Sequence, residues 1–277
     1  MSNPIKKSYQ QLLPLDEESR VIDQFGFLPM SVIKPKKTPI WDIAIGDDGD
    51  INGQTRRSAD ATYLPNLRFS KFHPQLAEMV VRYWSMPGDL VIDPFSGRAT
   101  RAVVTKTLGR SYVGFEVSIS TADFTEARLW DTDGPTSAIY RSDGCIMTEA
   151  QDETANLVFT CPPYHQLERY EDVAGQLSSI ASYESFCSRV TVAMRNIHRV
   201  LKPGAFLAWV CGDWRDGKAF RLFHHDSITM MQEVGLTIHD IVIIHNNSPF
   251  APLQAGKVAA KRYTSKVHEY LIIARKA

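Results

Sequence analysis

The sequence predicts an α/β fold, with a mainly parallel β-sheet that is covered by helices on both faces. From residue 74 onward, short apolar runs alternate with longer segments of helical periodicity. About five or more strands are separated by helices in this way, which is typical of a parallel sheet. Acidic residues follow the first two strands, at Asp93 and Glu116. Ligands of such sheets bind at the carboxyl ends of the strands, so we expect the functional site there.

Each element follows from its local pattern. The turn Pro87-Gly88-Asp89 leads into the first strand, and Gly109 stops the helix that comes after it. The expected helices are residues 74–84, 99–108, 183–201 and 222–234. The expected strands are residues 90–93, 111–116, 137–140, 157–160, 205–211, 238–244 and 269–274.

Composition sets limits on partners and cofactors. The 277 residues are 44% hydrophobic and have a formal net charge of zero, so attraction to a polyanion must come from local patches. The four cysteines form no CxxC pair and no histidine has zinc-ligand spacing, so we expect reduced thiols and no metal. No apolar run approaches the roughly 18–20 residues that span a bilayer, so we expect a soluble, cytoplasmic protein without a membrane partner.

The chain is expected to have two parts. Residues 1–66 show little sustained periodicity and are interpreted as an irregular N-terminal arm, whereas residues 67–277 form the main domain. A solvated leader is the alternative for the arm. Phe25, Phe27 and Trp41 favour partial packing of the arm on the main domain.

A nucleoside cofactor site is predicted between the first strand and the next helix. The segment from Asp93 to Thr100 places an acidic residue and a glycine turn there, but it has no run of glycines to hold a pyrophosphate. About 20 residues beyond Gly97, Glu116 can accept hydrogen bonds from both hydroxyls of a ribose. Asp143 follows the third strand and is placed to accept a hydrogen bond from an adenine amine. The alternative is that its side chain caps its own turn.

This segment resembles a known family. The sequence DPFSGRAT resembles the DPF-x-G-x-G-T motif of the amino-methyltransferases that modify adenine N6 or cytosine N4 in DNA, with Ala99 in place of a glycine. Residues 71–74 resemble the family's upstream cofactor element. The resemblance implies a Rossmann-like methyltransferase fold with seven strands, the last antiparallel, and S-adenosylmethionine as cofactor. The implied cofactor contacts are Lys71, His73, Pro74, Asp93, Pro94, Phe95, Ser96, Gly97, Thr100, Glu116 and Asp143.

The fourth strand runs into Cys161-Pro162-Pro163-Tyr164, a stiff loop because two prolines fix two φ angles and remove two donors. Transfer to an aromatic amine needs acceptors that favour a localised lone pair, and the base must be flipped out to reach them. The loop resembles the (Asp/Asn/Ser)-Pro-Pro-(Tyr/Phe/Trp) signature of amino-methyltransferases. By that resemblance the Pro162 carbonyl accepts an amine hydrogen and Tyr164 stacks on the base.

Cys161 departs from the signature, because a thiol is a poor acceptor. Two alternatives stay open for it: covalent catalysis as in cytosine C5 methyltransferases, or simple packing beside a site made by the backbone. The chain lacks the Glu-Asn-Val sequence of the C5 enzymes. Its TCPPY sequence with a later Gly212-Asp213-Trp214-Arg215 is similar to phage and bacterial DNA methylases.

DNA recognition is expected in loops after the fourth strand, since the cofactor motif precedes the catalytic loop. Basic and aromatic side chains suit phosphate contact and base stacking, although a solvated loop and a packed tryptophan are the alternatives. The candidates are Trp214, Arg215, Lys257, Lys261, Arg262 and Tyr263. DNA is the expected substrate; RNA and a non-catalytic binding role are the alternatives. A homodimer and a companion endonuclease are left open.

Overall fold

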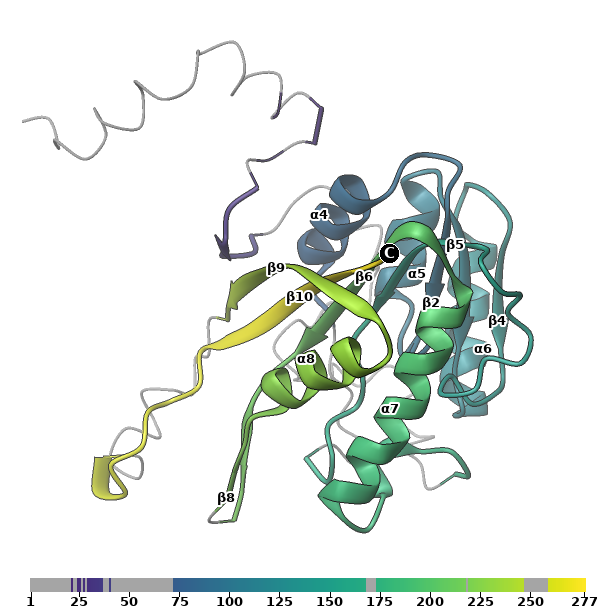
Figure 1. The fold of residues 1–277 in the computed structure, drawn as a ribbon. Helices are drawn as coiled ribbons and strands as arrows, with labels where there is room; N and C mark the ends of the chain where they lie inside the picture. The colour runs from purple at the N-terminus through teal and green to yellow at the C-terminus, as the bar shows by residue number, and fades with distance from the viewer. Residues whose placement is uncertain are drawn as a thin grey trace, which may run out of the picture.

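The computed structural model describes residues 72–167, 173–217, 219–246 and 259–277, together with residues 21, 24–25, 27, 29–36 and 40 of the N-terminal part. The main domain consists of a twisted sheet with helices in front of it and behind it (Figure 1). None of the helices within these ranges combines the length and apolarity that a membrane crossing requires.

The central sheet has the order β1-β9-β10-β6-β5-β2-β3-β4. Its strands are β1 (Val32–Ile33), β2 (Leu90–Asp93), β3 (Ser111–Phe115), β4 (Ser137–Tyr140), β5 (Ala155–Thr160), β6 (Leu201–Cys211), β9 (Leu236–His245) and β10 (His268–Lys276). Strand β10 is antiparallel to both β6 and β9, and every other pair in this order is parallel. The predicted mainly parallel sheet with an antiparallel last strand is therefore confirmed. One strand of this sheet was not predicted: β1, from the N-terminal part, adds two residues beside β9.

Helices cover the two faces in separate groups. Helices α4 (Pro74–Trp84) and α5 (Thr100–Thr107) pack on one face, where they meet the side chains of Val91, Leu157 and Phe159. Helix α6 (Ile119–Trp130) packs beside α5 through Ala102. Helices α7 (Tyr183–Val200) and α8 (Phe223–Glu233) pack on the other face, where they meet Ile92 and Val158. Neighbouring strand residues thus point to opposite faces, as the pleat of a strand requires.

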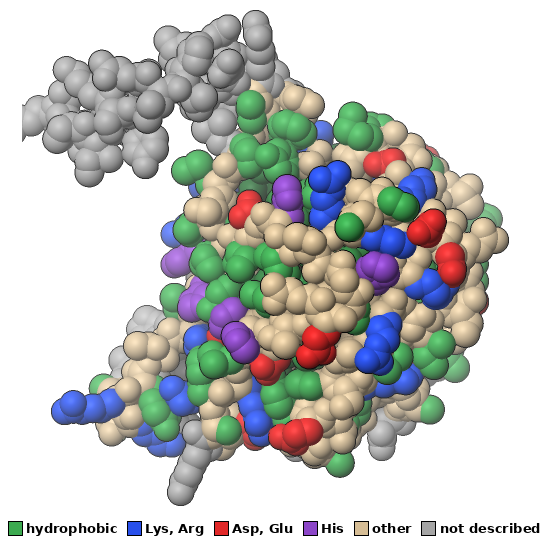
Figure 2. All heavy atoms as spheres, in the orientation of Figure 1, with side chains coloured by type: hydrophobic (Ala, Val, Ile, Leu, Met, Phe, Trp, Pro, Cys, Tyr) green, Lys and Arg blue, Asp and Glu red, His purple; other side chains and the backbone are tan. Residues whose placement is uncertain are grey.

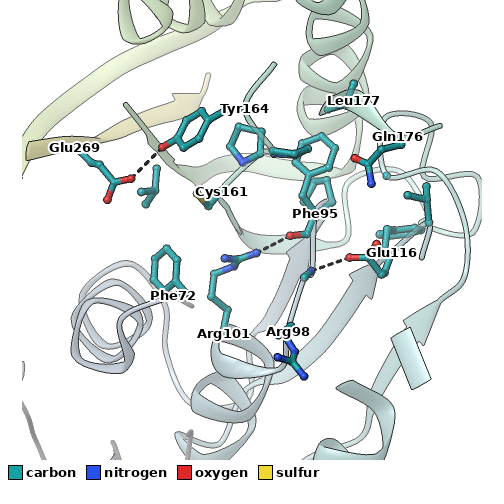
Figure 3. Close-up of a pocket in the computed structure, with 18 of the residues that line it drawn as sticks. Phe72, Phe95, Arg98, Arg101, Glu116, Cys161, Tyr164, Gln176, Leu177 and Glu269 are labelled. Atoms are coloured by element: carbon teal, nitrogen blue, oxygen red, sulfur yellow. Dashed lines mark hydrogen bonds between the residues drawn. The ribbon is translucent and has the colours of Figure 1, made fainter. Parts of the chain in front are cut away.

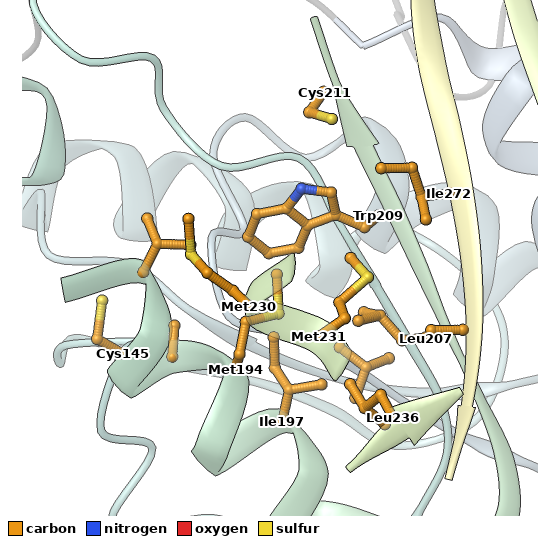
Figure 4. Packing of buried hydrophobic residues seen from close by; sticks show 14 of the residues in the cluster. Cys145, Met194, Ile197, Leu207, Trp209, Cys211, Met230, Met231, Leu236 and Ile272 are labelled. Carbon is orange, nitrogen blue, oxygen red and sulfur yellow. The ribbon is translucent and has the colours of Figure 1, made fainter. Parts of the chain in front are cut away.

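The core under α7 and α8 is centred on Trp209 of β6. Its indole is fully buried among Met194, Met230 and Met231, as Figure 4 shows. The buried indole N–H donates to Ser227 Oγ at 3.2 Å, so its polar edge is satisfied. This packing fixes β6 next to β5, the strand that precedes the Cys161–Tyr164 loop.

Two smaller elements lie beyond the sheet. A hairpin of β7 (Trp214–Asp216) and β8 (Ala219–Arg221) follows β6, and a short 3₁₀ helix, η3 (Leu177–Ser179), precedes α7. In the N-terminal part, Phe25 and Phe27 contact Tyr83 of α4, with ring centroids 4.9 and 6.0 Å apart. Both aromatic residues therefore pack on the main domain as expected, whereas Trp41 lies outside the described residues.

Candidate active site

A cavity of about 370 Å³ opens at the carboxyl ends of the strands, where the order reverses between β2 and β5. This is the edge at which the sequence predicts the site. Loops after β2, β3, β4 and β5 line it, with the facing ends of β9 and β10 (Figure 3). The lining residues are Phe72, His73, Leu76, Pro94, Phe95, Gly97, Arg98, Arg101, Phe115, Glu116, Val117, Asp143, Gly144, Cys161, Pro162, Pro163, Tyr164, Gly175, Gln176, Leu177, Val210, Ile244, Asn246 and Glu269.

The loop after β2 contributes Pro94, Phe95 and Gly97 to the cavity wall, as predicted. Gly97 has a φ of 54°, a conformation that favours glycine. Asp93 takes a different place: its side chain is fully buried and it does not line the cavity. Nor do Ser96 and Thr100, which are buried beneath the loop. The structure therefore places these three predicted contacts outside the cavity wall.

Asp93 is the centre of a buried hydrogen-bond network. Its carboxylate accepts bonds from Arg101 Nε at 2.7 Å, Tyr112 OH at 2.9 Å and Thr160 Oγ1 at 2.6 Å. The backbone N–H of Phe95 donates to it at 3.1 Å. A buried carboxylate is stable only when paired and hydrogen-bonded, and these four donors meet that condition. They also tie the ends of β2 and β5 together.

Arg101 is a cavity residue that the sequence analysis missed. It lies in α5 and is 6% exposed. Burial opposes its charge, but the charge and hydrogen bond of Asp93 outweigh burial, so the pKa of Arg101 is raised and the side chain stays cationic. Its guanidinium lies over the rings of Phe72 at 4.9 Å and Phe159 at 6.0 Å. A charged residue in the otherwise apolar stretch Ala102-Val103-Val104 is the signal that could have identified it.

Glu116 stands at the end of β3, as predicted. Its Oε2 accepts from Gly97 N at 3.0 Å and its Oε1 from Ser118 N at 2.9 Å. Burial raises the pKa of Glu116, and those backbone bonds oppose the rise. Each oxygen has further acceptor capacity, so the carboxylate can receive two more donors from the cavity.

Asp143 lines the cavity from the loop after β4. One oxygen accepts from Cys145 N at 2.8 Å, and the other pairs with Arg189 of α7. Asp143 therefore does cap its own turn, while remaining part of the cavity wall. The neighbouring Gly144 is required by space, because a Cβ there would lie 1.7 Å from the carbonyl oxygen of Pro94.

The start of α4 forms another wall. His73 is the N-cap residue of α4 and lines the cavity, and burial lowers its pKa to about 4, so the ring is neutral at neutral pH. Pro74 begins the helix and is buried outside the cavity wall. Lys71 lies outside the described residues. Phe72 packs edge-on against Phe159 at 5.5 Å.

All four residues of the loop after β5, Cys161 to Tyr164, line the cavity. Tyr164 OH donates to Glu269 Oε1 of β10 at 3.0 Å, and Asn246 Nδ2 donates to Glu269 Oε2 at 2.8 Å. Burial, and then the Glu269 charge, raise the pKa of Tyr164 well above its ordinary value, so the phenol stays protonated. Glu269 and Asn246 were missed because they lie about a hundred residues from the loop that they contact.

Trp214 is placed in the core and not on a recognition surface. It is 6% exposed, and its ring meets Tyr164 at 5.5 Å, Phe223 at 5.5 Å and Tyr183 at 5.8 Å. The predicted contact with nucleic acid is therefore replaced by the packing alternative, since its faces are occupied by other rings. In this position Trp214 supports Tyr164 from outside the cavity.

Arg215 and the segment before β10 form one exposed surface. Arg215 lies over the ring of Tyr263 at 3.6 Å, and Lys266 lies over Phe220 of the hairpin at 4.4 Å. Lys261 and Arg262 are exposed in the adjoining turn, and Lys and Arg side chains gather at this projection (Figure 2). We call Arg215, Lys261, Arg262, Tyr263 and Lys266 the basic surface. Lys257 lies outside the described residues.

Comparison with known proteins agrees with this geometry. A family model described as DNA methylase matches residues 5–126 and 155–277, which is most of the chain. The chain belongs to the DNA methylase family. Type II methyltransferase M.HinfI of Haemophilus influenzae is 47% identical over 108 residues, or 38% of this chain and 28% of that protein. Type II methyltransferase M.MthZI of Methanothermobacter thermautotrophicus is 26% identical over 159 residues, or 51% of this chain and 45% of that protein. The chain thus spans less than half the length of these relatives.

Solved structures share the fold at low sequence identity. A SAM-dependent methyltransferase of Methanosarcina mazei has a TM-score of 0.50 at 12% identity and covers 71% of this chain and 96% of its own. TrmN of Thermus thermophilus has a TM-score of 0.51 at 14% identity and covers 74% of this chain and 49% of its own. These likenesses confirm the methyltransferase fold that the resemblance implies.

Proposed function

We propose that this DNA methylase family member transfers a methyl group from S-adenosylmethionine to the exocyclic amine of a flipped adenine (N6) or cytosine (N4) in DNA. The observation that carries the proposal is one shared cavity. The Cys161–Tyr164 loop, with its resemblance to the amino-methyltransferase signature, faces the same space as Glu116 and the Phe95 loop. Donor and acceptor sites thus adjoin each other, as a direct transfer requires. The relatives' name, type II methyltransferase, agrees with a DNA-modifying role.

The residues present fit S-adenosylmethionine. Both oxygens of Glu116 can accept from a pair of ribose hydroxyls, and Asp143 stands beside them for an adenine amine. Gln176 and Leu177 add a polar and an apolar side chain to the same cavity, both largely buried. A volume of about 370 Å³ is within the range of small-molecule sites.

When bound, this cofactor supplies an activated methyl group whose carbon is attacked by the amine nitrogen, leaving a thioether. The protein's part is to hold the amine. The Pro162 carbonyl accepts one amine hydrogen, which favours a localised lone pair on the nitrogen. Neither Pro162 nor Pro163 has a backbone N–H, so neither can donate to that lone pair and block it. Tyr164 positions the base, and the surplus proton passes to solvent after transfer.

The basic surface is proposed to contact the DNA backbone. The side chains of four residues are exposed: Arg215, Lys261, Arg262 and Lys266. None of them forms an ion pair with a carboxylate among the residues that the structure describes. Arg215 stacks on Tyr263, so its planar guanidinium is held in place, and its edge can donate to phosphate oxygens. Lys257 remains a predicted member of this contact.

A transfer assay tests the proposal. Purified protein is incubated with methyl-labelled S-adenosylmethionine and unmethylated DNA or RNA, and the products are digested to nucleosides. We expect label on N6 of adenine or N4 of cytosine in DNA. Label on RNA alone, or cofactor binding without any labelled base, would refute it.

Variants of the loop identify the chemistry. Tyr164→Ala should abolish transfer with cofactor affinity retained, because the base loses its platform. Tyr164→Phe is the matched control: it keeps the ring, removes the bond to Glu269 and should retain transfer. Cys161→Ser should keep transfer to an amine, whereas an enzyme that uses the thiol as a C5 nucleophile would lose it. Normal turnover by Tyr164→Ala contradicts the assigned site.

A further inference from the structure

The hydrogen bonds of Arg101 leave one edge of its guanidinium unused. Nε donates to Asp93 Oδ2 at 2.7 Å, and Nη2 donates to the carbonyl oxygens of Phe95 at 2.5 Å and Ser96 at 3.3 Å. Nη1 makes no hydrogen bond to the residues that the structure describes, although Arg101 is 6% exposed and lines the cavity. Nη1 is not among the buried side-chain atoms without a partner, so it is accessible from the cavity that Arg101 lines. The network therefore accounts for Nε and Nη2 of the guanidinium but not for Nη1.

The position of Arg101 relative to Glu116 narrows the chemistry of that partner. Both charged groups hold the same short loop: Gly97 N donates to Glu116, while Phe95 and Ser96 accept from Arg101. The loop residues Phe95 and Gly97 are two positions apart, which is at most about 7 Å of chain. In Figure 3, Glu116 lies on one side of this loop and Arg101, beside Phe72, on the other. A ligand in the cavity thus meets acceptors at one end and a cation at the other.

We infer that Arg101 binds the carboxylate of the cofactor's methionine part through Nη1. The inference rests on the proposed function, since it takes S-adenosylmethionine as the ligand. Its ribose carries the hydroxyl donors that suit Glu116, and its other end carries a carboxylate that suits a guanidinium. Asp93, which the family resemblance implies as a cofactor contact, then acts indirectly: it holds Arg101 in place.

Stacking supports the assignment. The guanidinium lies over Phe72, so its plane is fixed on that side, and Nε and Nη2 are fixed by Asp93 and the loop carbonyls. A cation that is oriented before the ligand arrives loses little freedom on binding, which strengthens a charge-assisted hydrogen bond. Arg98 lines the same cavity, but its guanidinium lies over Phe124 of α6 at 4.4 Å.

Calorimetry with two ligands tests the inference without any turnover. The first ligand is S-adenosylhomocysteine, which keeps the carboxylate. The second is the carboxamide derivative of S-adenosylhomocysteine, in which a neutral group of similar shape replaces the charged carboxylate. We expect the wild type to prefer S-adenosylhomocysteine by about 10- to 100-fold, the range for a hydrogen bond between charged groups. Arg101→Gln should reduce that preference to about threefold or less. A structural role alone would weaken both ligands equally and leave the preference intact, which overturns the inference.

Two further variants keep the result interpretable. Arg110→Gln is the matched control: Arg110 is also buried, at 5% exposed, and donates to Ser85 and Leu108 away from the cavity, so the preference should persist. If Arg101→Gln does not fold, Asp93→Asn/Arg101→Gln, which leaves no charge of this pair unpaired, should bind both ligands alike. Equal binding of both ligands by the wild type overturns the role of Arg101 alone, whereas binding of neither contradicts the proposed function.

A phosphate of the target nucleotide is the competing partner. Deoxyadenosine monophosphate and deoxyadenosine differ only in that group, so their affinities are compared in wild type and in Arg101→Gln. We expect no preference that depends on Arg101. A preference for the monophosphate that disappears in Arg101→Gln would assign the arginine to the substrate and overturn the inference.

Discussion

The substitution Asp93→Asn tests whether the buried network holds the site together. Asp93 is 0% exposed and carries the negative charge next to Arg101. Asparagine has nearly the same shape, and its carbonyl oxygen can still accept from Phe95 N and Thr160 Oγ1, but its NH₂ group cannot accept from Arg101 or Tyr112. The substitution therefore leaves a buried arginine without a counter-charge.

The structure gives the magnitude of the effect. Removing one partner of a buried ion pair costs about 3–5 kcal/mol, against a total stability of about 5–15 kcal/mol. Thr160→Val removes one hydrogen bond to the same carboxylate, at 2.6 Å, and should cost about 1.5–3 kcal/mol. We thus expect Asp93→Asn to lower the free energy of unfolding more than Thr160→Val does. Volume changes little in either case, so the difference reports charge and hydrogen bonding.

Urea unfolding followed by circular dichroism measures these costs, with the double variant Asp93→Asn/Arg101→Gln completing a cycle. We expect the double variant to be more stable than the sum of the single effects predicts, by about 2–3 kcal/mol, because the second change removes the unpaired charge. The control pair Asp93→Asn with Arg110→Gln should be additive. A cost below about 1 kcal/mol for Asp93→Asn, or additivity in the first cycle, would refute the reasoning.

Three further predictions concern the cavity walls and the basic surface. Gly144→Ala places a Cβ 1.7 Å from the Pro94 carbonyl oxygen, so it should cost roughly 1–3 kcal/mol or more in urea unfolding and weaken cofactor binding in calorimetry; unchanged values would contradict that contact. Burial lowers the pKa of His73 from 6.5 to about 4. Between pH 4 and pH 6.5 the unfolded state therefore binds more protons than the folded state, so the free energy of unfolding should fall as the pH is lowered from 6.5 to 4. This loss of stability is at most about 3 kcal/mol, and partial exposure of the ring makes it smaller. The substitution His73→Gln should flatten the dependence of the free energy of unfolding on pH. Arg215→Ala should lower the slope of log K against log salt for DNA by about 1 at unchanged cofactor affinity, and an unchanged slope would remove Arg215 from the interface.

Strands β2, β5 and β6 could be predicted because they are largely buried and read as apolar runs. The predicted and observed bounds of the first strand agree, from Leu90 to Asp93. Strand β6 begins earlier than predicted, at Leu201, because Leu201 also pairs with Ala155 of β5. The register shifts between this pair and the next one, Leu157 with Phe206, and Pro203 and Gly204 lie in that irregular part. Helix α6 was not predicted: its terminal residues Ile119 and Trp130 are 61% and 89% exposed, so its apolar residues do not mark one buried face.

The site could be predicted only where its residues follow strands closely in sequence. Glu116 and the Cys161–Tyr164 loop come directly after β3 and β5, so topology alone brings them to one edge. Glu269 and Arg101 depend on which way a side chain points from β10 and α5, which sequence periodicity does not resolve. Asp93 shows the converse: its position in sequence was predicted, but its side chain is buried, accepts from four donors and does not line the cavity.

The bond from Thr160 Oγ1 to Asp93 also bears on the unusual Cys161. It joins the last residue of β5 to the last residue of β2, so the Cys161–Tyr164 loop and the loop after β2 are held at a common point. Thr160 immediately precedes Cys161, and the next two positions are prolines with restricted φ angles. The path of the backbone through the loop is thus restricted on both sides of Cys161, by the Thr160 hydrogen bond before it and by the two prolines after it. Under the proposed function, in which the Pro162 carbonyl accepts from the amine, such a loop can tolerate a poor acceptor in the first position.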